Sequence, residues 1–543
     1  MVKGDIVVLV PPESRIGIRK VQVEGMERPV KLDPAIKKLH LLLSKPAIHD
    51  VRPDFERLAD SLQKRRFTHV EIDHELLQIL PNILRDAKWD ITVTIWNSER
   101  IISVEGGNSE NIIYGFSVDI GTSKIVGYLV DLISGNVVSI QSLENPQIIY
   151  GEDVVSRINY ISDSNEALKK LQEIVIEAIN TLIGSACREA GVNSDKIYEV
   201  TIVGNTAMHH IFLGIPPKYL MVAPYVPSIK RAVDVKATSV KMKTSPCANV
   251  HVLPVIAGFV GGDAVADVLA TGIYEMEERC LLVDVGTNGE IFVGNQEDIV
   301  SCSCAAGPAF EGMHIKFGMK ASTGAIERLK ISPSSYEVDY KTIDKTRPIG
   351  LCGSGIIDAV AELLKCGIIN ERGGFNKNIQ TSRVRYVNGE AEFVIAWKDE
   401  TKLGSDITIS RKDIQEIQLA KAAIHTGAVI LMGKKNLTDN DLDRVYMAGA
   451  FGRYISPESA RFIGLIPDVP TEKISFVGNT AVSGAKMALT SREMRETARR
   501  LSTEIRYIEL MADPNFRKEF LNSMFLPHRD ANKYPTIANY FHR

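Results

Sequence analysis

Two short stretches decide the fold: Asp119-Ile120-Gly121-Thr122-Ser123 and Asp284-Val285-Gly286-Thr287-Asn288-Gly289. Each follows an apolar run, at 114–119 or 281–284, that reads as a β-strand. Each precedes a second run, at 124–131 or 290–294, that returns as the hairpin partner of the first. Because the same order of strand, turn and strand occurs twice, the sequence predicts an internal duplication.

Long amphipathic segments extend this duplication. In the first half, apolar residues from Leu168 to Leu182 recur at helical spacing, and Gly191 closes the segment. In the second half, apolar residues from Ile414 to Leu431 repeat the pattern. We therefore expect two related α/β halves with a cleft between them.

The chemistry is expected at the two turns. Glycine lets the backbone turn tightly, so that N–H groups and the threonine hydroxyl point at a phosphate. Mg²⁺ bound to phosphates needs one or two carboxylates nearby, a role that suits the strand-end residues Asp119 and Asp284 as metal ligands and catalytic groups. One such turn is weak evidence, because many strands end in this way, but two in corresponding positions are much stronger. The predicted phosphate-binding residues are Gly121, Thr122, Ser123, Gly286, Thr287, Asn288 and Gly289.

Three further segments fit a nucleotide cleft. Asp263 follows Gly261-Gly262 at the start of a predicted helix, where it is a third catalytic candidate or, alternatively, a helix N-cap. A strand at 445–448 enters a turn of small residues that would let adenine lie against the backbone, although an ordinary strand-to-helix turn has the same composition. A small-faced helix that begins near 479 can pair with the helix after Asp263. The nucleotide-binding candidates here are Gly449, Ala450, Gly452, Gly478 and Asn479.

These elements occur in the order of a duplicated actin-like (ribonuclease H-like) ATPase domain with two halves around a cleft, which is the fold class that we expect. A polar break at 106–111 separates it from a small α+β domain with strands at 5–10, 69–72 and 91–96 and a helix at 54–64. The predicted domains are residues 1–108, residues 112–275 as half I, and residues 276–543 as half II with a C-terminal extension.

Composition excludes several classes of function. The chain has 543 residues, with 64 Lys and Arg against 67 Asp and Glu. A net charge of -3 gives no field that would attract nucleic acid or a membrane surface. We find neither a signal sequence nor an apolar span of about 20 residues, so a cytoplasmic protein is expected.

The seven cysteines are scattered, and Cys302 and Cys304 are the only close pair. Their spacing places both side chains on one face of a strand, whereas iron–sulfur and zinc sites usually have C-x₂-C or wider spacing. We therefore favour two buried core residues and expect no iron–sulfur cluster in this chain.

Several motifs then resemble one particular family. The chain from 115 to about 530 is similar to the C-terminal ATPase domain of the reductive activators of corrinoid proteins, and residues 1–105 are similar to the middle domain of that family. The motifs that carry the resemblance are Asn145-Pro146-Gln147, 150–158, Gly204-Asn205-Thr206-Ala207-Met208-His209-His210, 305–312, 352–358, 418–424 and Met524-Phe525-Leu526-Pro527-His528.

The resemblance implies ATP-driven rescue of an oxidised corrinoid. ATP and Mg²⁺ would be the cofactors, and a methyltransfer corrinoid protein would be the partner whose Co(II) is returned to Co(I). Members of the family carry an iron–sulfur ferredoxin module that this sequence lacks at both ends. Either the chain is shortened, or it takes electrons from a separate ferredoxin-type donor.

Two other classes stay open. A small-molecule kinase of the same fold would use Asp263 as the base for a substrate hydroxyl. An actin-like or chaperone-like assembly protein would be switched by ATP without chemistry on a partner. The sequence does not fix the oligomeric state, and a homodimer is one alternative. His209 and His210 could touch a corrinoid, but packed and hydrogen-bonded histidines are commoner at such a position.

Overall fold

Two six-stranded sheets form the body of the protein. The computed structural model describes residues 25–162, 164–449, 455–538 and 540. The first sheet has the order β7 (Val137–Glu144), β6 (Lys124–Asp131), β5 (Tyr114–Ile120), β8 (Ile197–Gly204), β10 (Asn249–Val252) and β9 (Val233–Lys236). The second has the order β21 (Ile474–Gly478), β20 (Arg444–Ala448), β11 (Cys280–Val285), β12 (Gly289–Gly294), β13 (Ile299–Cys304) and β22 (Arg506–Tyr507).

Strand pairing confirms the predicted duplication. β5 pairs antiparallel with β6 and parallel with β8. In the same way, β11 pairs antiparallel with β12 and parallel with β20. Both predicted hairpins therefore lie at the centre of a sheet, and a turn of the same kind ends each central strand. The protein has the expected duplicated α/β architecture of an actin-like domain.

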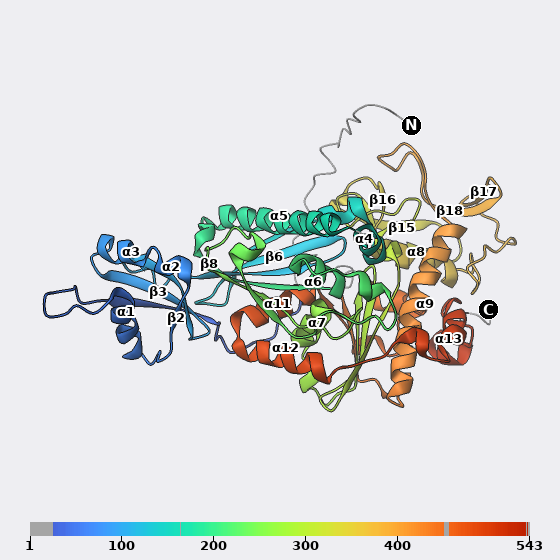
Figure 1. Ribbon diagram of the computed structural model, residues 1–543. Coiled ribbons are helices and arrows are strands. Elements are labelled where there is room, and N and C mark those ends of the chain that lie inside the picture. Colours follow the sequence, from blue (N-terminus) through green and yellow to red (C-terminus); the bar gives the residue numbers. More distant parts are fainter. Residues whose placement is uncertain (1–24, 163, 450–454, 539, 541–543) are drawn as a thin grey trace.

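The long helices also match their predictions. α5 (Asn165–Ala190) packs on β6 and β7; Ser164 caps its start, and Gly191 ends it in a left-handed conformation with φ of 66°. α9 (Arg411–Lys434) packs on β12 and β13 of the second sheet. Figure 1 shows α5 along one side of the first sheet and α9 crossing the far end of the molecule. Each half thus buries one face of its sheet under a long helix.

Two helices with small residues lie against each other between the sheets. α7 (Gly262–Thr271) packs on α11 (Thr480–Thr490), as the sequence predicted for the helices after Asp263 and Asn479. A Cβ atom on Gly484 would lie 2.1 Å from the carbonyl oxygen of Ala266, so the contact requires glycine. α11 also packs on β5 and β8, which brings the C-terminal part of the chain back onto the first sheet.

The N-terminal lobe has its own sheet, in the order β1 (Ile36–Leu42), β3 (Asp90–Trp96), β4 (Arg100–Gly106) and β2 (Glu71–Ile72). α1 (Asp54–Gln63), α2 (His74–Leu77) and α3 (Leu80–Asp86) complete it, and the lobe projects from one end of the body (Figure 1). The predicted strand at 5–10 lies outside the described residues. β1 was not predicted from the sequence.

Half II carries two small sheets that the sequence did not reveal. The first has the order β15 (Val338–Thr342), β14 (Ala325–Ile331) and β16 (Gly350–Leu351). The second has the order β17 (Val384–Val387), β18 (Glu390–Ala396) and β19 (Ile407–Ser410).

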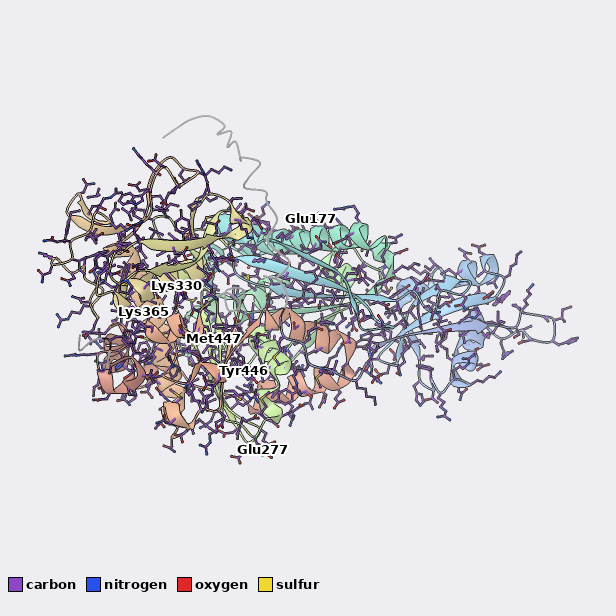
Figure 2. The ribbon with its side chains drawn as sticks, turned by 180° about the vertical axis from the view of Figure 1, so that it is seen from behind. Glu177, Glu277, Lys330, Lys365, Tyr446 and Met447 are labelled. Carbon is purple, nitrogen blue, oxygen red and sulfur yellow. The ribbon has the colours of Figure 1, made fainter. Side chains whose placement is uncertain are left out.

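In Figure 2, Tyr446 and Met447 of β20 lie near the middle of the body, whereas Glu177 and Glu277 lie near opposite edges. Among the described residues, no helix has both the length and the apolar character needed to cross a membrane.

Candidate active site

The two hairpin turns face one cavity of about 190 Å³ between the halves. Helix starts and strand ends from both halves complete its wall. The predicted residues that line it are Asp119, Gly121, Thr122, Ser123, Asp263, Asp284, Gly286, Thr287, Asn288, Gly449 and Asn479. Segments separated by more than 300 residues in the sequence thus meet in one place, as the duplication requires.

Four predicted residues stand apart from this set. Gly289 is the first residue of β12, directly after the turn, and is absent from the cavity wall. Gly478 ends β21 with φ of 70°, and its carbonyl oxygen accepts a hydrogen bond from the N–H of Gly449 at 2.9 Å. Ala450 and Gly452 lie outside the described residues.

Glycine is required where the backbone approaches the second turn. Gly449 has φ of 95°, and a Cβ atom on it would lie 2.7 Å from Oδ1 of Asp284 and 2.5 Å from the carbonyl oxygen of Val285. Gly449 therefore lies directly against the carboxylate end of the second hairpin. Contact with adenine stays a prediction for this residue.

The three acidic residues predicted for the site line the cavity from different elements. Asp119 lies near the end of β5, Asp284 near the end of β11, and Asp263 in the first turn of α7. Asn479 Nδ2 donates to Asp119 Oδ2 at 3.2 Å, which joins the start of α11 to the first hairpin. The N-cap of α7 is Gly261, so the alternative role of Asp263 as a cap is wrong.

Burial dominates the electrostatics of these acids. It raises the pKa of Asp119 to about 7 and that of Asp284 to about 6. The pKa of Asp263 rises to about 8, because burial is reinforced by the neighbouring charge of Asp119. Burial and nearby carboxylates also raise the pKa of Asp267 and Glu290. Carboxylate oxygens are hard donors, and the ionised form of these acids is unfavourable when no positive charge lies beside them. The group therefore fits a divalent cation.

Several cavity residues were not predicted. Lys124 directly follows the first motif, and burial lowers its pKa to about 8. Glu311 accepts a hydrogen bond from Thr287 Oγ1 at 2.5 Å, and Asn205 Nδ2 donates to Thr122 Oγ1 at 3.0 Å. Asn205 and Glu311 belong to motifs quoted above for the family resemblance. Their placement beside the turns could have been inferred from those motifs, whereas the distant Lys320 gave no such signal.

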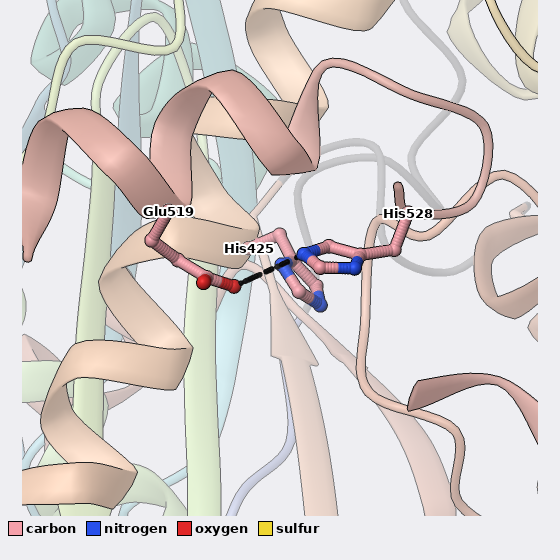
Figure 3. A group of neighbouring side chains, drawn as sticks. All are labelled: His425, Glu519 and His528. Carbon is pink, nitrogen blue, oxygen red and sulfur yellow. Dashed lines mark hydrogen bonds and ion pairs between the residues drawn. The ribbon is translucent and has the colours of Figure 1, made fainter. Parts of the chain in front are cut away.

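A second polar cluster lies outside the cavity, where His425, Glu519 and His528 converge (Figure 3). His528 Nε2 lies 3.2 Å from Glu519 Oε1, and Lys533 Nζ donates to the same oxygen at 2.7 Å. On α9, Lys421 is fully buried and donates to the carbonyl oxygens of Phe525 and Pro527, both at 2.5 Å. Because the ammonium group of Lys533 already neutralises the Glu519 carboxylate, this cluster is less suited to binding a metal cation. Together with Lys421, it instead holds the C-terminal segment against α9.

The two histidines and two cysteines for which the sequence allowed more than one role are buried. His210 Nδ1 lies 2.8 Å from the carbonyl oxygen of Thr206, and its Nε2 accepts from the N–H of Ser228 at 3.0 Å. His209 is also buried, and burial lowers its pKa to about 3. Cys302 and Cys304 are buried on β13, in agreement with the predicted core role.

The raised pKa values predict a pH dependence. If the cavity takes Mg·ATP, as the sequence leads us to expect, binding should tighten as pH rises from about 6 to about 8, because a bound cation favours ionised Asp119, Asp263 and Asp284. In the same range these groups hold more protons in the folded protein than in the unfolded chain. The stability of the metal-free protein should therefore fall from about pH 4 to about pH 8 through their titration. Calorimetric titration with Mg·ATP in two buffers of different ionisation enthalpy would measure the protons that the three acids release on binding. An affinity independent of pH would contradict the placement of the cation beside these acids.

Comparisons with known proteins agree with this geometry. The family model described as the C-terminal domain of RACo, the ASKHA domain, matches residues 278–538. The models of the RACo middle region and of the RACo linker region match residues 114–276 and 25–111. Two expectations are corrected by these matches: the N-terminal segment that we compared with the middle domain matches the linker region, and the part before residue 277 that we compared with the C-terminal ATPase domain matches the middle region.

Individual relatives match most of the chain. The corrinoid activation enzyme RamQ of Eubacterium limosum is 38% identical over 440 residues, which cover 79% of this chain and 74% of RamQ. The [Co(II) methylated amine-specific corrinoid protein] reductase of Methanosarcina barkeri is 27% identical over 403 residues, 69% of each chain. The solved structure of a reductive activator for corrinoid, iron–sulfur protein has a TM-score of 0.87 and 37% identity, and the match covers 95% of this chain and 83% of that one.

The fold and the paired hairpins thus define an actin-like ATPase domain of the ASKHA class. Within that class, the chain belongs to the RACo family of reductive activators of corrinoid proteins.

Proposed function

We propose that this protein uses Mg·ATP to return an oxidised Co(II) corrinoid on a partner methyltransfer protein to Co(I). The observation that carries the proposal is the pair of phosphate-type hairpins around one acidic cavity, in a chain 38% identical to a corrinoid activation enzyme. One electron from a separate ferredoxin-type donor reduces the cobalt. ATP is hydrolysed by water to ADP and phosphate.

Each part of the cavity has a proposed role. Asp119 and Asp284 would hold Mg²⁺ from opposite hairpins, and the N–H groups of both turns would bind the phosphates. Asp263 would orient the attacking water. The donor set supports this assignment, because its carboxylates are buried and their pKa values are raised when no cation neutralises them.

Closure of the two halves would couple the nucleotide to the partner. ATP can drive a conformational change only if it binds one arrangement of the halves better than another. Contacts across the cleft that could sense the nucleotide include Asn479 with Asp119 and the ion pair of Lys320 with Glu144, both beside the cavity. We propose residues 112–275 and 276–543 as the moving halves and residues 1–108 as an attached lobe.

Anaerobic visible spectroscopy of a corrinoid partner tests the function. We expect Co(I) to form rapidly only when the protein, ATP and a low-potential donor are all present. The donor alone and ATP alone serve as controls, and a nonhydrolysable ATP analogue separates binding from turnover. Equal reduction with and without ATP would contradict the proposal. Stoichiometric transfer of phosphate to a sugar or acid would instead favour the kinase alternative.

A further inference from the structure

The carbonyl groups of the first phosphate turn are all held from behind by one segment, residues 145–157, which we call the brace. Asn145 Nδ2 donates to the carbonyl oxygen of Gly121 at 2.9 Å. Arg157 Nη2 donates to that of Thr122 at 2.5 Å, and the N–H of Asn145 donates to that of Ser123 at 3.0 Å. Three successive carbonyls of the turn are thus fixed by two residues.

Arg157 is buried, and its hydrogen bonds within the described part of the chain go to neutral acceptors. Its side chain is 0% exposed, and its Nε donates to the carbonyl oxygen of Gly151 at 2.9 Å. Nη1 lies 3.3 Å from Oε1 of Gln147 and 3.5 Å from Sδ of Met208. Burial lowers the pKa of Arg157 to about 10, although the nearby charge of Asp153 acts in the opposite direction, so the guanidinium stays charged near neutral pH. A buried cation whose hydrogen bonds go to neutral acceptors is costly, which calls for a reason beyond packing.

Peptide geometry supplies that reason. In a planar trans peptide, the carbonyl oxygen of Thr122 and the N–H of Ser123 point in opposite directions. A cation on the oxygen therefore leaves the N–H directed away from the brace, and it polarises the peptide so that the N–H becomes a stronger donor. Thr122 and Ser123 both line the cavity.

The second turn is held differently. The carbonyl oxygen of Thr287 accepts from the backbone N–H of Gly307 at 2.9 Å, and that of Asn288 accepts from the N–H of Gly286 at 3.0 Å. Neutral backbone N–H groups are therefore sufficient to hold the carbonyls of such a turn. The first turn differs because a buried guanidinium binds one of its carbonyls.

We propose that Arg157, assisted by Asn145, is a positioning residue that fixes and polarises the first turn for binding the phosphates of the nucleotide. Arg157 acts through the Thr122–Ser123 peptide and does not itself touch the nucleotide. This inference rests on the proposed binding of ATP in the cavity, and it adds the residues that set the strength of one phosphate-binding turn.

Binding measurements on Arg157→Met and Arg157→Lys test the inference. Met keeps the approximate length without charge or donors, and Lys keeps the charge but loses the planar fork. We expect ATP affinity to fall on the order of 10- to 100-fold in Arg157→Met, with a smaller loss in Arg157→Lys. Affinity for adenosine, which has no phosphate, should change less than twofold. A purely structural arginine would not separate the two ligands.

Arg383→Met is the matched control. Arg383 is also buried and donates to the backbone carbonyls of Val394 at 3.0 Å and Ile395 at 3.3 Å; it differs from Arg157 in pairing with the Glu337 carboxylate, and it lies outside the cavity wall. Its loss should lower the melting temperature without weakening ATP binding. If Arg157→Met does not fold, Asn145→Asp provides the test, because Asp keeps the acceptor for the N–H of Gln147 and replaces the donor to Gly121.

The outcomes separate the two proposals. If the wild-type chain binds ATP and the folded Arg157 and Asn145 variants bind it equally well, the inference is overturned while the proposed function stands. Parallel loss of ATP and adenosine binding would also overturn it, because the defect would then not concern the phosphates. If the wild-type chain binds no ATP, both proposals fail.

Discussion

Replacing Asp284 by asparagine is expected to slow ATP hydrolysis about 100-fold or more, the largest functional effect that we predict. Asparagine fills the same space but removes the negative charge that would hold Mg²⁺ beside the phosphates. The folded protein should not suffer, because burial raises the pKa of Asp284 to about 6 and its ionised form is unfavourable without a cation. At pH 8 without Mg²⁺, the variant should melt at the same temperature as the wild type or higher.

Phosphate release and thermal melts measured on the same samples check this result. Asp358→Asn is the control, since Asp358 is also buried and has a pKa raised by burial, but it lies on α8 (Gly353–Lys365), outside the cavity wall. Its rate of hydrolysis should stay within about twofold of wild type, the spread expected for a site remote from the chemistry. Unchanged turnover in Asp284→Asn would remove Asp284 from the proposed metal site.

The repeated motif made the main architecture predictable. One strand that ends in Asp-x-Gly-Thr is weak evidence, but two such strands in corresponding places indicated two halves that face each other. The hairpins β5–β6 and β11–β12 and the pairing of α7 with α11 followed from local patterns of glycine and apolar residues. Periodicity and turn chemistry are short-range signals, so they predicted the hairpins and the helices themselves, whereas the pairing of α7 with α11 was inferred from the small residues on both helices.

The contacts that tune the site were not predictable in this way. Arg157 on α4 (Val154–Ile161) belongs to the motif 150–158 quoted for the family resemblance, but only the fold places it beside the turn at Thr122. Lys320 reaches the cavity from a segment without a recognisable motif. Lys421 lies in the quoted motif 418–424, and nothing in that motif indicates that it is buried against the C-terminal segment. Each depends on tertiary contacts between segments that the sequence does not pair.

The contact between α7 and α11 should be sensitive to a single added methyl group. At Gly484 of α11, a Cβ atom would lie 2.1 Å from the carbonyl oxygen of Ala266 in α7. Backbone cannot move aside as a flexible side chain can, so the two helices would have to separate along their contact. We expect Gly484→Ala to lower the free energy of unfolding by about 2–3 kcal/mol, although alanine is intrinsically the better helix former. ATP-induced stabilisation should also decrease, because α7 carries Asp263 and α11 begins next to Asn479.

The same substitution at Gly433 provides the comparison, because a Cβ atom there meets nothing within 4 Å inside the helical range of α9. Gly433→Ala should leave stability unchanged or raise it by up to about 1 kcal/mol through helix propensity alone. Chemical denaturation of both variants, each with and without Mg·ATP, separates the propensity effect from the steric one. Equal stability changes at the two glycines would show that α7 and α11 can separate freely. In that case the close contact between α7 and α11 would not fix the relative position of the two halves around the cavity.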